Sequence, residues 1–445
     1  MRGTERQGNL YGRSSADPSM NHSIRVPNRR KMTAGSTSRK TYLLLAIVVV
    51  IFFLAAYSWR GSAGVASTFQ GRPKAAVFRQ PQPKAPGVGH INLSAGPYAV
   101  ERSDLVLAIP TDNLHMELVE AGRQWHKGIR TYLAVNDSSV VAAKQQEAPA
   151  FQETWELFAD DQHLKALHPG DSRAALAPFL AHQAFGDTYK WMLYGDDDTM
   201  FFVEGIQNLV KDIDPNMPYL ITDHLWWSSV KGTIGNHPNP EAPRCLPCNY
   251  TAPESWMDEL PAFAAPRGCP CTAQLICQTD ERHIFDADCH IPLHPLERTY
   301  SMHGGAGALL SIGLMRSVPL SFMQDCLANA GVTTGGDALL TICLWKAGYA
   351  HTDPGFSFYH PTVRMFDPGP EDSPGLLYAM TEALSGRCDP SCQLQLQHVI
   401  TSHIRSRHQA SLHSTAQMMR ALSNTWDLYA SQIFAPRQST ASSIN

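Results

Sequence analysis

Three consecutive carboxylates, Asp196, Asp197 and Asp198, follow the apolar run from Trp191 to Gly195. Such a run is typical of a buried strand of a parallel sheet that ends in a turn. Buried carboxylates this close together need a cation to offset their charge, and ligands of open α/β sheets bind beyond the carboxyl ends of the strands. We therefore predict a divalent cation, Mg²⁺ or Mn²⁺, held together with a substrate diphosphate. That chemistry is typical of an enzyme that uses a nucleotide sugar.

The chain around the triplet alternates between strand and helix patterns, which predicts an α/β fold with a parallel sheet. Strands are expected at 105–110, 131–135, 191–194 and 219–222, and helices at 114–125, 174–185, 206–213 and 336–345. A further strand is expected at 355–360, where it ends in His360. The alternative to a metal site is an acidic turn exposed to solvent. The apolar residues that also follow the three aspartates disfavour it.

The amino terminus predicts a membrane anchor. Residues 41–59 are 19 residues without a charge, which is long enough to span roughly the hydrocarbon core of a bilayer. The polar tail 1–40 carries basic residues and is expected to be disordered and cytosolic, which places the rest of the chain in the lumen. A cleaved signal peptide is the alternative, and the long hydrophilic leader disfavours it. Residues 60–98, rich in Pro and Gly, are expected to form a stem.

The cysteines agree with a lumenal location. All ten follow the predicted anchor, and in an oxidising lumen disulfides are the default, with a pairing that the sequence does not give. Six lie in 232–298, a proline-rich insertion that interrupts the strand and helix pattern. Zinc binding by Cys245-x-x-Cys248 with Cys269-x-Cys271 is the alternative there. Three glycosylation sequons follow the anchor as well: Asn92, Asn136 and Asn249. These features indicate a single-pass type II protein of the Golgi membrane.

The composition argues against nucleic acid as a partner. The 445-residue chain has a formal net charge of −4, and its basic residues do not cluster in the large carboxyl-terminal part. Hydrophobic residues make up 43% of the chain, which is enough for a substantial core. We expect the folded domain at 103–392, and the polar segment 393–445, with a modest helical pattern around 412–428, to be peripheral.

Three motifs together resemble those of the fringe-like glycosyltransferases, the inverting β1,3-glycosyltransferase family that includes the fringe enzymes and the core 1 β1,3-galactosyltransferase. They are Lys190–Thr199 with the aspartate triplet, His303–Ser311 with its Gly-Gly-Ala-Gly run, and Gly336-Asp337-Ala-Leu-Leu. The resemblance spans roughly residues 103–360. It implies a GT-A-type, Rossmann-like mixed sheet flanked by helices. It also implies transfer of a sugar from a UDP-sugar donor to a glycan or glycoprotein acceptor, with inversion and a β1,3 linkage.

The resemblance implies the metal and donor ligands. Asp198 and Asp196 are expected to hold Mn²⁺ or Mg²⁺, and His360 to complete the ligand set through a ring nitrogen. Asp196 and Asp197 are also expected to contact the nucleotide sugar, with contact to the metal as the alternative for Asp197. The bound cation would neutralise the diphosphate leaving group, which is the main electrostatic demand of the transfer.

The resemblance also implies a general base. Asp337 is expected to take the proton of the acceptor hydroxyl, and a helix N-cap is its alternative and compatible role. The family usually has two acids at this helix, and here Gly336 occupies the place of the first. Three glycines are expected to let the backbone approach the substrate, with a tight turn as the alternative: Gly304, Gly305 and Gly307.

Two rival functions use the same features. One is a catalytically inactive, membrane-anchored glycan-binding or chaperone protein on the same fold. A cluster of mutually repelling acids disfavours it, because a fold without catalysis has no physical need for them. The other is a metal-dependent phosphoester hydrolase, for which the sequence lacks a recognisable second set of His and Asp ligands.

Overall fold

A computed structural model describes residues 91–159, 170–227, 242–248, 250, 269–278, 285, 288–291, 300–330, 335–360, 363–368, 373–405 and 411–434. These residues belong to one compact unit, Pro83–Asn445. The predicted tail 1–40, the predicted anchor 41–59 and most of the predicted stem lie outside the described residues. In the part of the chain that the structure describes, every helix is too short or too polar to cross a bilayer.

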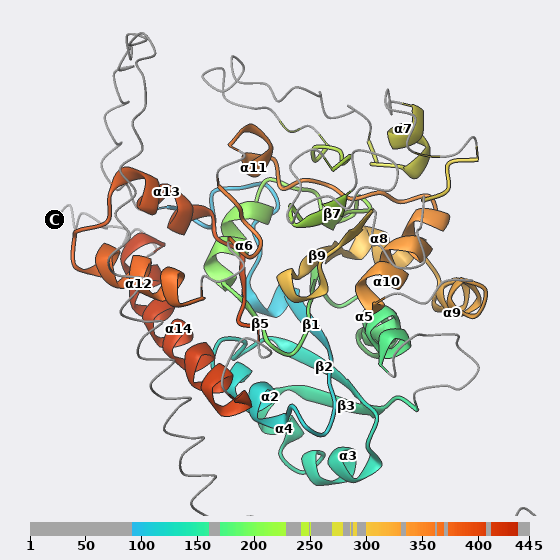
Figure 1. The fold of residues 1–445 in the computed structure, drawn as a ribbon, viewed down its shortest axis with the longest axis horizontal. Coiled ribbons are helices and arrows are strands. Elements are labelled where there is room, and N and C mark those ends of the chain that lie inside the picture. Colours follow the sequence, from blue (N-terminus) through green and yellow to red (C-terminus); the bar gives the residue numbers. More distant parts are fainter. Residues whose placement is uncertain are drawn as a thin grey trace, which may run out of the picture. The chain divides into compact units, whose positions relative to one another are not determined.

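A six-stranded sheet with the order β3-β2-β1-β4-β9-β6 forms the centre of the molecule (Figure 1). Strands β1 to β4 are parallel, and β9 runs antiparallel to both of its neighbours, so the predicted mixed α/β fold is confirmed. The strands are β1 (Leu105–Pro110), β2 (Arg130–Val135), β3 (Glu153–Leu157), β4 (Trp191–Tyr194), β6 (Leu220–Ile221) and β9 (Ala308–Ser311). The central strands are apolar throughout because helices cover both faces.

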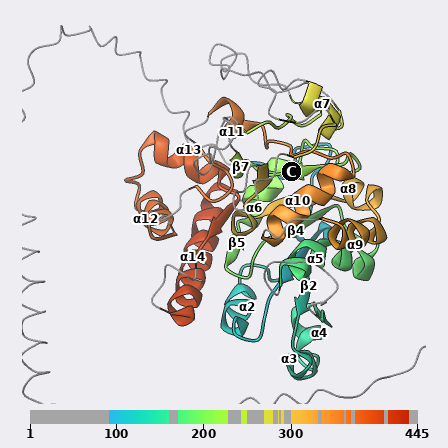
Figure 2. The same cartoon turned by 45° about the vertical axis from the view of Figure 1, so that its right-hand side comes forward.

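The two faces of the sheet bury separate sets of side chains. Along β4, Met192 and Tyr194 join the core beneath α5 (Asp171–Phe185), α9 (Leu320–Ala328) and α10 (Gly336–Lys346). Trp191 and Leu193 join the core on the other face, which the carboxyl-terminal helices cover. This alternation is the period-two pattern of a strand. Figure 2 shows the two groups of helices on either side of the sheet.

Shorter elements connect these layers. The helices on the amino-terminal side are η1 (Arg102–Asp104), α2 (Met116–Gly122), α3 (Ser138–Lys144), α4 (Ala148–Phe151) and α6 (Val203–Val210). Those that follow are α7 (Ala273–Gln278), η3 (Gly304–Ala306), α8 (Ile312–Ser317), α11 (Phe356–Tyr359), α12 (Ser373–Leu384), α13 (Pro390–His398) and α14 (Leu412–Ile433). Two small antiparallel pairs complete the fold: β5 (Thr199–Phe201) with β10 (Thr401–His403), and β7 (Leu225–Trp227) with β8 (Tyr300–Met302).

The carboxyl-terminal segment is not peripheral, contrary to the expectation for 393–445. Strand β10 pairs with β5 directly after the aspartate triplet. Helix α14 runs beside α2 and α12 (Figure 1). The side chain of Trp426 on α14 is 3% exposed, its ring lies 4.5 Å from that of Phe202, and its indole N–H donates to Glu204 Oε2 at 2.7 Å. The helical pattern at 412–428 was a genuine amphipathic signal, because its apolar residues cover one face of the domain.

The last residues of the predicted stem belong to the folded domain. The N–H of Ile91 donates to the carbonyl of Ile433 at 2.9 Å, and the N–H of Tyr98 donates to the carbonyl of Lys211 at 2.8 Å. Residues 91–98, predicted as stem, are therefore hydrogen-bonded to the folded domain that was expected to begin at residue 103.

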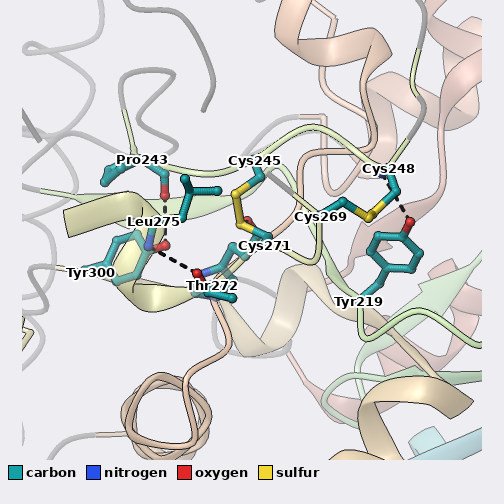
Figure 3. Close-up of a disulfide and its surroundings, with 10 residues drawn as sticks. Tyr219, Pro243, Cys245, Cys248, Cys269, Cys271, Thr272, Leu275 and Tyr300 are labelled. Atoms are coloured by element: carbon teal, nitrogen blue, oxygen red, sulfur yellow. Dashed lines mark hydrogen bonds between the residues drawn. A yellow bond between two sulfur atoms is a disulfide. The ribbon is translucent and has the colours of Figure 1, made fainter. Parts of the chain in front are cut away.

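Disulfides secure the described parts of the 232–298 insertion. Cys245 pairs with Cys271 and Cys248 with Cys269, side by side (Figure 3). A hydrogen bond attaches the second pair to the domain: the N–H of Cys248 donates to the Tyr219 hydroxyl at 3.1 Å. The remaining pairs are Cys277–Cys289, Cys326–Cys343 and Cys388–Cys392. Disulfides are thus confirmed, and the zinc alternative is wrong, because a zinc ligand must be a thiolate.

We predict that Trp426→Ala destabilises the domain. Removing this buried ring leaves a cavity between α14 and α6, and such truncations cost about 3–5 kcal/mol of the free energy of unfolding. The measurement is chemical denaturation of the purified protein. Leu428→Ala, on the same helix but with Leu428 61% exposed, is the control and should change that free energy by no more than about 0.5 kcal/mol. Equal stability of the two variants would contradict the packing of α14.

Candidate functional site

Asp196, Asp198 and His403 form a group that could hold a metal ion. One ligand atom from each of the three side chains lies within 4.8 Å of the others. Nε2 of His403 is 3.1 Å from Oδ1 of Asp198. The two aspartates follow β4, and the histidine comes from β10, where it lies opposite Thr199 of β5. Two carboxylates and one imidazole are a ligand set that a divalent cation can use.

The predicted histidine ligand was His360, whereas the histidine that lies beside Asp196 and Asp198 in the structure is His403. Residues 356–359 form the short helix α11 rather than the expected strand, and Gly355, with φ +99°, precedes it. His360 ends this helix with its ring 4.6 Å from that of Phe356, a residue that lines a different cavity. His360 does not belong to the metal-binding group of the described residues. The aromatic run before it is explained by burial in α11, not by a strand.

The backbone around His403 is fixed by hydrogen bonds. Its N–H donates to Oδ1 of Asp367 at 3.2 Å, and that carboxylate also accepts from Arg405 at 2.7 Å. The N–H of Ile404 donates to the carbonyl of Asp198 at 2.9 Å. Asp367 and Arg405 are both buried. Strand pairing and this buried ion pair therefore hold the imidazole against the aspartates.

Asp197 is not part of the metal-binding group and bonds to the loop after β1. Its Oδ2 accepts hydrogen bonds from the Thr111 hydroxyl at 2.8 Å and from Nδ1 of His115 at 2.9 Å. The hydrogen bond to Asp197 raises the pKa of His115 to about 9. Asp197 thus joins the end of β4 to the loop after β1. This position is compatible with its predicted contact to the nucleotide sugar.

The glycine run at 304–307 allows close packing at the site. A Cβ on Gly304 would lie 3.3 Å from Oδ1 of Asp196 and 3.2 Å from Cβ of Asp337, and one on Gly305 would overlap the His403 ring. Gly307 has φ +76°, which favours glycine. The loop is therefore more than a turn, since a side chain at 304 or 305 would displace the functional groups.

Asp337 lies in the first turn of α10 and reaches this glycine loop. Its Oδ2 accepts a hydrogen bond from the N–H of Gly304 at 3.0 Å. The N-cap of α10 is Gly335, so the N-cap alternative for Asp337 is wrong. A Cβ on Gly336 would overlap Ala174 and the backbone of Asp171. The close packing of α10 on α5 therefore leaves no room for an acid at 336.

A cleft of about 390 Å³ joins these groups. Its walls come from the loop after β1, the triplet, the glycine loop, β10 and the first turns of α5 and α10. Aspartates dominate the charged residues of its lining: Asp112, Asp171, Asp196, Asp197, Asp198 and Asp337. The structure thus brings Asp196, Asp197, Asp198, Gly305 and Asp337 together at one cleft, with Gly304 and Gly307 in the adjoining loop.

The electrostatics of the cleft favour a cation. Burial, and then repulsion from Asp198, raise the pKa of Asp196 to about 7. Burial alone would lower the pKa of His403, but its hydrogen bond to Asp198 and the nearby carboxylates raise it. A bound divalent cation would stabilise the ionised form of Asp196 and Asp198.

Sequence reasoning missed His403, because its segment is polar and lacks a recognisable motif. The signal in the chain was faint: the β-branched residues Val399, Ile400 and Thr401 precede the histidine by a few positions. It also missed Arg173, which lines the cleft, and the positioning pair of Asp367 and Arg405.

Comparisons with known proteins give a distant likeness. No family model and no curated protein matches this chain. Chains of solved structures do match, and one is the apo-form glycosyltransferase GlyE in Streptococcus pneumoniae TIGR4. The two share 12% sequence identity and a TM-score of 0.29, over 74% of this chain. This chain spans 64% of the length of that protein.

We predict that His403→Gln weakens the binding of Mn²⁺ by at least about tenfold, because an imidazole is lost from the ligand set. His360→Gln is the matched control and should leave Mn²⁺ affinity unchanged. Titration with Mn²⁺, followed by the electron paramagnetic resonance of the free ion, measures both. The opposite ranking of the two variants would restore His360 as the ligand.

Metal affinity should rise with pH. The pKa of Asp196 is about 7 and that of His403 is raised, so both side chains bind protons that a metal must displace. Mn²⁺ should therefore bind more tightly at about pH 8 than at about pH 6, by about tenfold or more for each proton released. Calorimetric titrations in buffers of different ionisation enthalpy count the released protons. Binding that is independent of pH would contradict the ionisation states described above.

Proposed function

We propose that this protein is a metal-dependent inverting glycosyltransferase that transfers a sugar from a nucleotide sugar to a glycan or glycoprotein acceptor. The observation that carries the proposal is the arrangement of two carboxylates, a histidine and a separate carboxylate around one cleft at the carboxyl ends of parallel strands. Ligands of open α/β sheets bind at this edge. The motifs that resemble the fringe-like family contribute all of these groups except the histidine.

The ligand set fits a divalent cation. Burial and the neighbouring carboxylate of Asp198 raise the pKa of Asp196, and a cation bound there would offset both effects. Asp196, Asp198 and His403 would hold Mn²⁺ or Mg²⁺. When bound, the cation would neutralise the charge that develops on the diphosphate leaving group.

Asp337 would act as the general base. The N–H of Gly304 holds one of its oxygens and orients the carboxylate at the cleft. The acceptor hydroxyl would lose its proton to Asp337 as its oxygen forms a bond to the anomeric carbon of the donor sugar. The bond from that carbon to the diphosphate breaks at the same time, and the diphosphate leaves with the electron pair. Attack opposite the leaving group inverts the configuration at the anomeric carbon.

The donor and the cellular location extend this proposal. A UDP-sugar, a β1,3 linkage and Mn²⁺ are the choices that the fringe-like motifs support. The uncharged segment 41–59 and the basic residues before it support a type II protein of the Golgi membrane with a lumenal cleft. The sequon asparagines Asn92 and Asn136 are both exposed, as glycosylation requires.

The general base separates an enzyme from an inactive glycan-binding protein. Asp337→Asn keeps an oxygen that can accept from Gly304 but cannot take a proton at neutral pH, so transfer should fall by about 10²- to 10⁴-fold. Donor binding in Mn²⁺ and the melting temperature should change little. Turnover of a panel of UDP- and GDP-sugars by the lumenal fragment, with and without Mn²⁺, provides the reference rate. A variant as active as the parent would remove Asp337 from the mechanism.

A further inference from the structure

Arg173 stands out in the lining of the acidic cleft. It lies in the first turn of α5, and its side chain is buried, with 6% exposed. Among the described residues that line the cleft it is the one lysine or arginine, against six aspartates. A guanidinium keeps its charge at every physiological pH. It is therefore a permanent cation placed where the proposed substrate would enter.

The start of α5 is shaped around this guanidinium. Gly170, the N-cap residue, has φ +100°, and a Cβ at that residue would lie 2.9 Å from Nη2 of Arg173. The guanidinium therefore folds back over the glycine, in space that another residue would fill. Gly335 and Gly336, at the start of α10, also line the cleft, and the close approach of Gly336 to Asp171 brings the two helix ends together.

The negative charge of the cleft gives the guanidinium of Arg173 a role in attracting an anionic substrate. The metal-binding group and Asp337 concentrate negative charge, which repels an anionic substrate. A nucleotide sugar brings a diphosphate, and the planar fork of a guanidinium matches phosphate and carboxylate oxygens with paired hydrogen bonds. A buried guanidinium makes such bonds stronger than an exposed one does, because water competes less.

We propose that Arg173 binds anionic oxygens of the donor and is a donor-binding residue of this cleft, an inference that rests on the proposed function. Two groups of a nucleotide sugar supply such oxygens: the diphosphate, and the carboxylate of a uronic acid. The shared chemistry is a paired hydrogen bond from the guanidinium to two anionic oxygens. Arg173 and the metal-binding group then contact the donor from different elements, α5 for the one and the β4 and β10 ends for the other.

The test compares Arg173→Gln with the parent chain in Mn²⁺, using UDP, uridine, inorganic pyrophosphate, UDP-galactose and UDP-glucuronate as probes in calorimetric titrations. If Arg173 binds the diphosphate, the variant should bind UDP and pyrophosphate about tenfold to a hundredfold more weakly, with uridine affinity unchanged. If it binds a sugar carboxylate, UDP affinity should persist, and only the affinity for UDP-glucuronate should fall. Either pattern supports the inference.

Two controls keep the test decisive. Arg316→Gln removes an arginine that bonds Asp187 and Asn216 away from the cleft, and it should leave all affinities unchanged. Arg173→Lys retains the charge without the fork, so it should fold if the charge is needed for stability and should restore only part of the affinity. Mn²⁺ binding without nucleotide should be the same in all variants.

The outcomes separate the two proposals. A parent chain that binds UDP in Mn²⁺, together with Arg173 variants that bind every probe equally well, would overturn the role of Arg173 alone. A parent chain that binds neither UDP nor any UDP-sugar would overturn the proposed function, and the role of Arg173 with it.

Discussion

The burial of like charges is the constraint on which the cleft depends. Asp196, Asp197 and Asp198 are consecutive, so the backbone cannot separate them by more than a few ångströms. The structure gives side-chain partners to Asp197 and Asp198 but leaves Asp196 with a raised pKa. Asp197 bonds Thr111 and His115, Asp198 bonds His403, and Asp196 keeps a raised pKa. The cleft therefore holds negative charge that the surrounding residues compensate only in part and that a bound divalent cation would neutralise.

Segments that are far apart in the chain meet at these carboxylates. His403 reaches the triplet because β10 pairs with β5, and Asp367 and Arg405 form a buried ion pair that fixes the backbone on either side. The glycine run lets a loop pass between Asp196 and Asp337. In each case the backbone lies close to a charged side chain. Small residues make this approach possible, and backbone N–H groups donate hydrogen bonds to the carboxylates.

The sequence predicted most of what local pattern controls. The strand at Trp191 and the helices that became α5 and α10 are rich in apolar residues that the core buries, and the aspartate triplet follows a strand. His403 could not be predicted in the same way. Its proposed role as a metal ligand depends on a strand pairing that spans about two hundred residues, and such pairings leave little trace in one sequence. His360 resembled a strand end because Phe-Ser-Phe-Tyr is aromatic, whereas the chain turns into a short helix at Gly355.

The pairing of β10 with β5 has a consequence for biosynthesis. Chains are synthesised from the amino terminus, and domains fold as their residues emerge. The triplet leaves the ribosome some two hundred residues before its histidine, and α14, which packs beside α2, comes later still. Until then the carboxylates lie without their imidazole partner. Completion of the proposed metal site thus coincides with completion of the fold, so a chain truncated before β10 would be a nascent intermediate unable to acquire its full set of metal ligands.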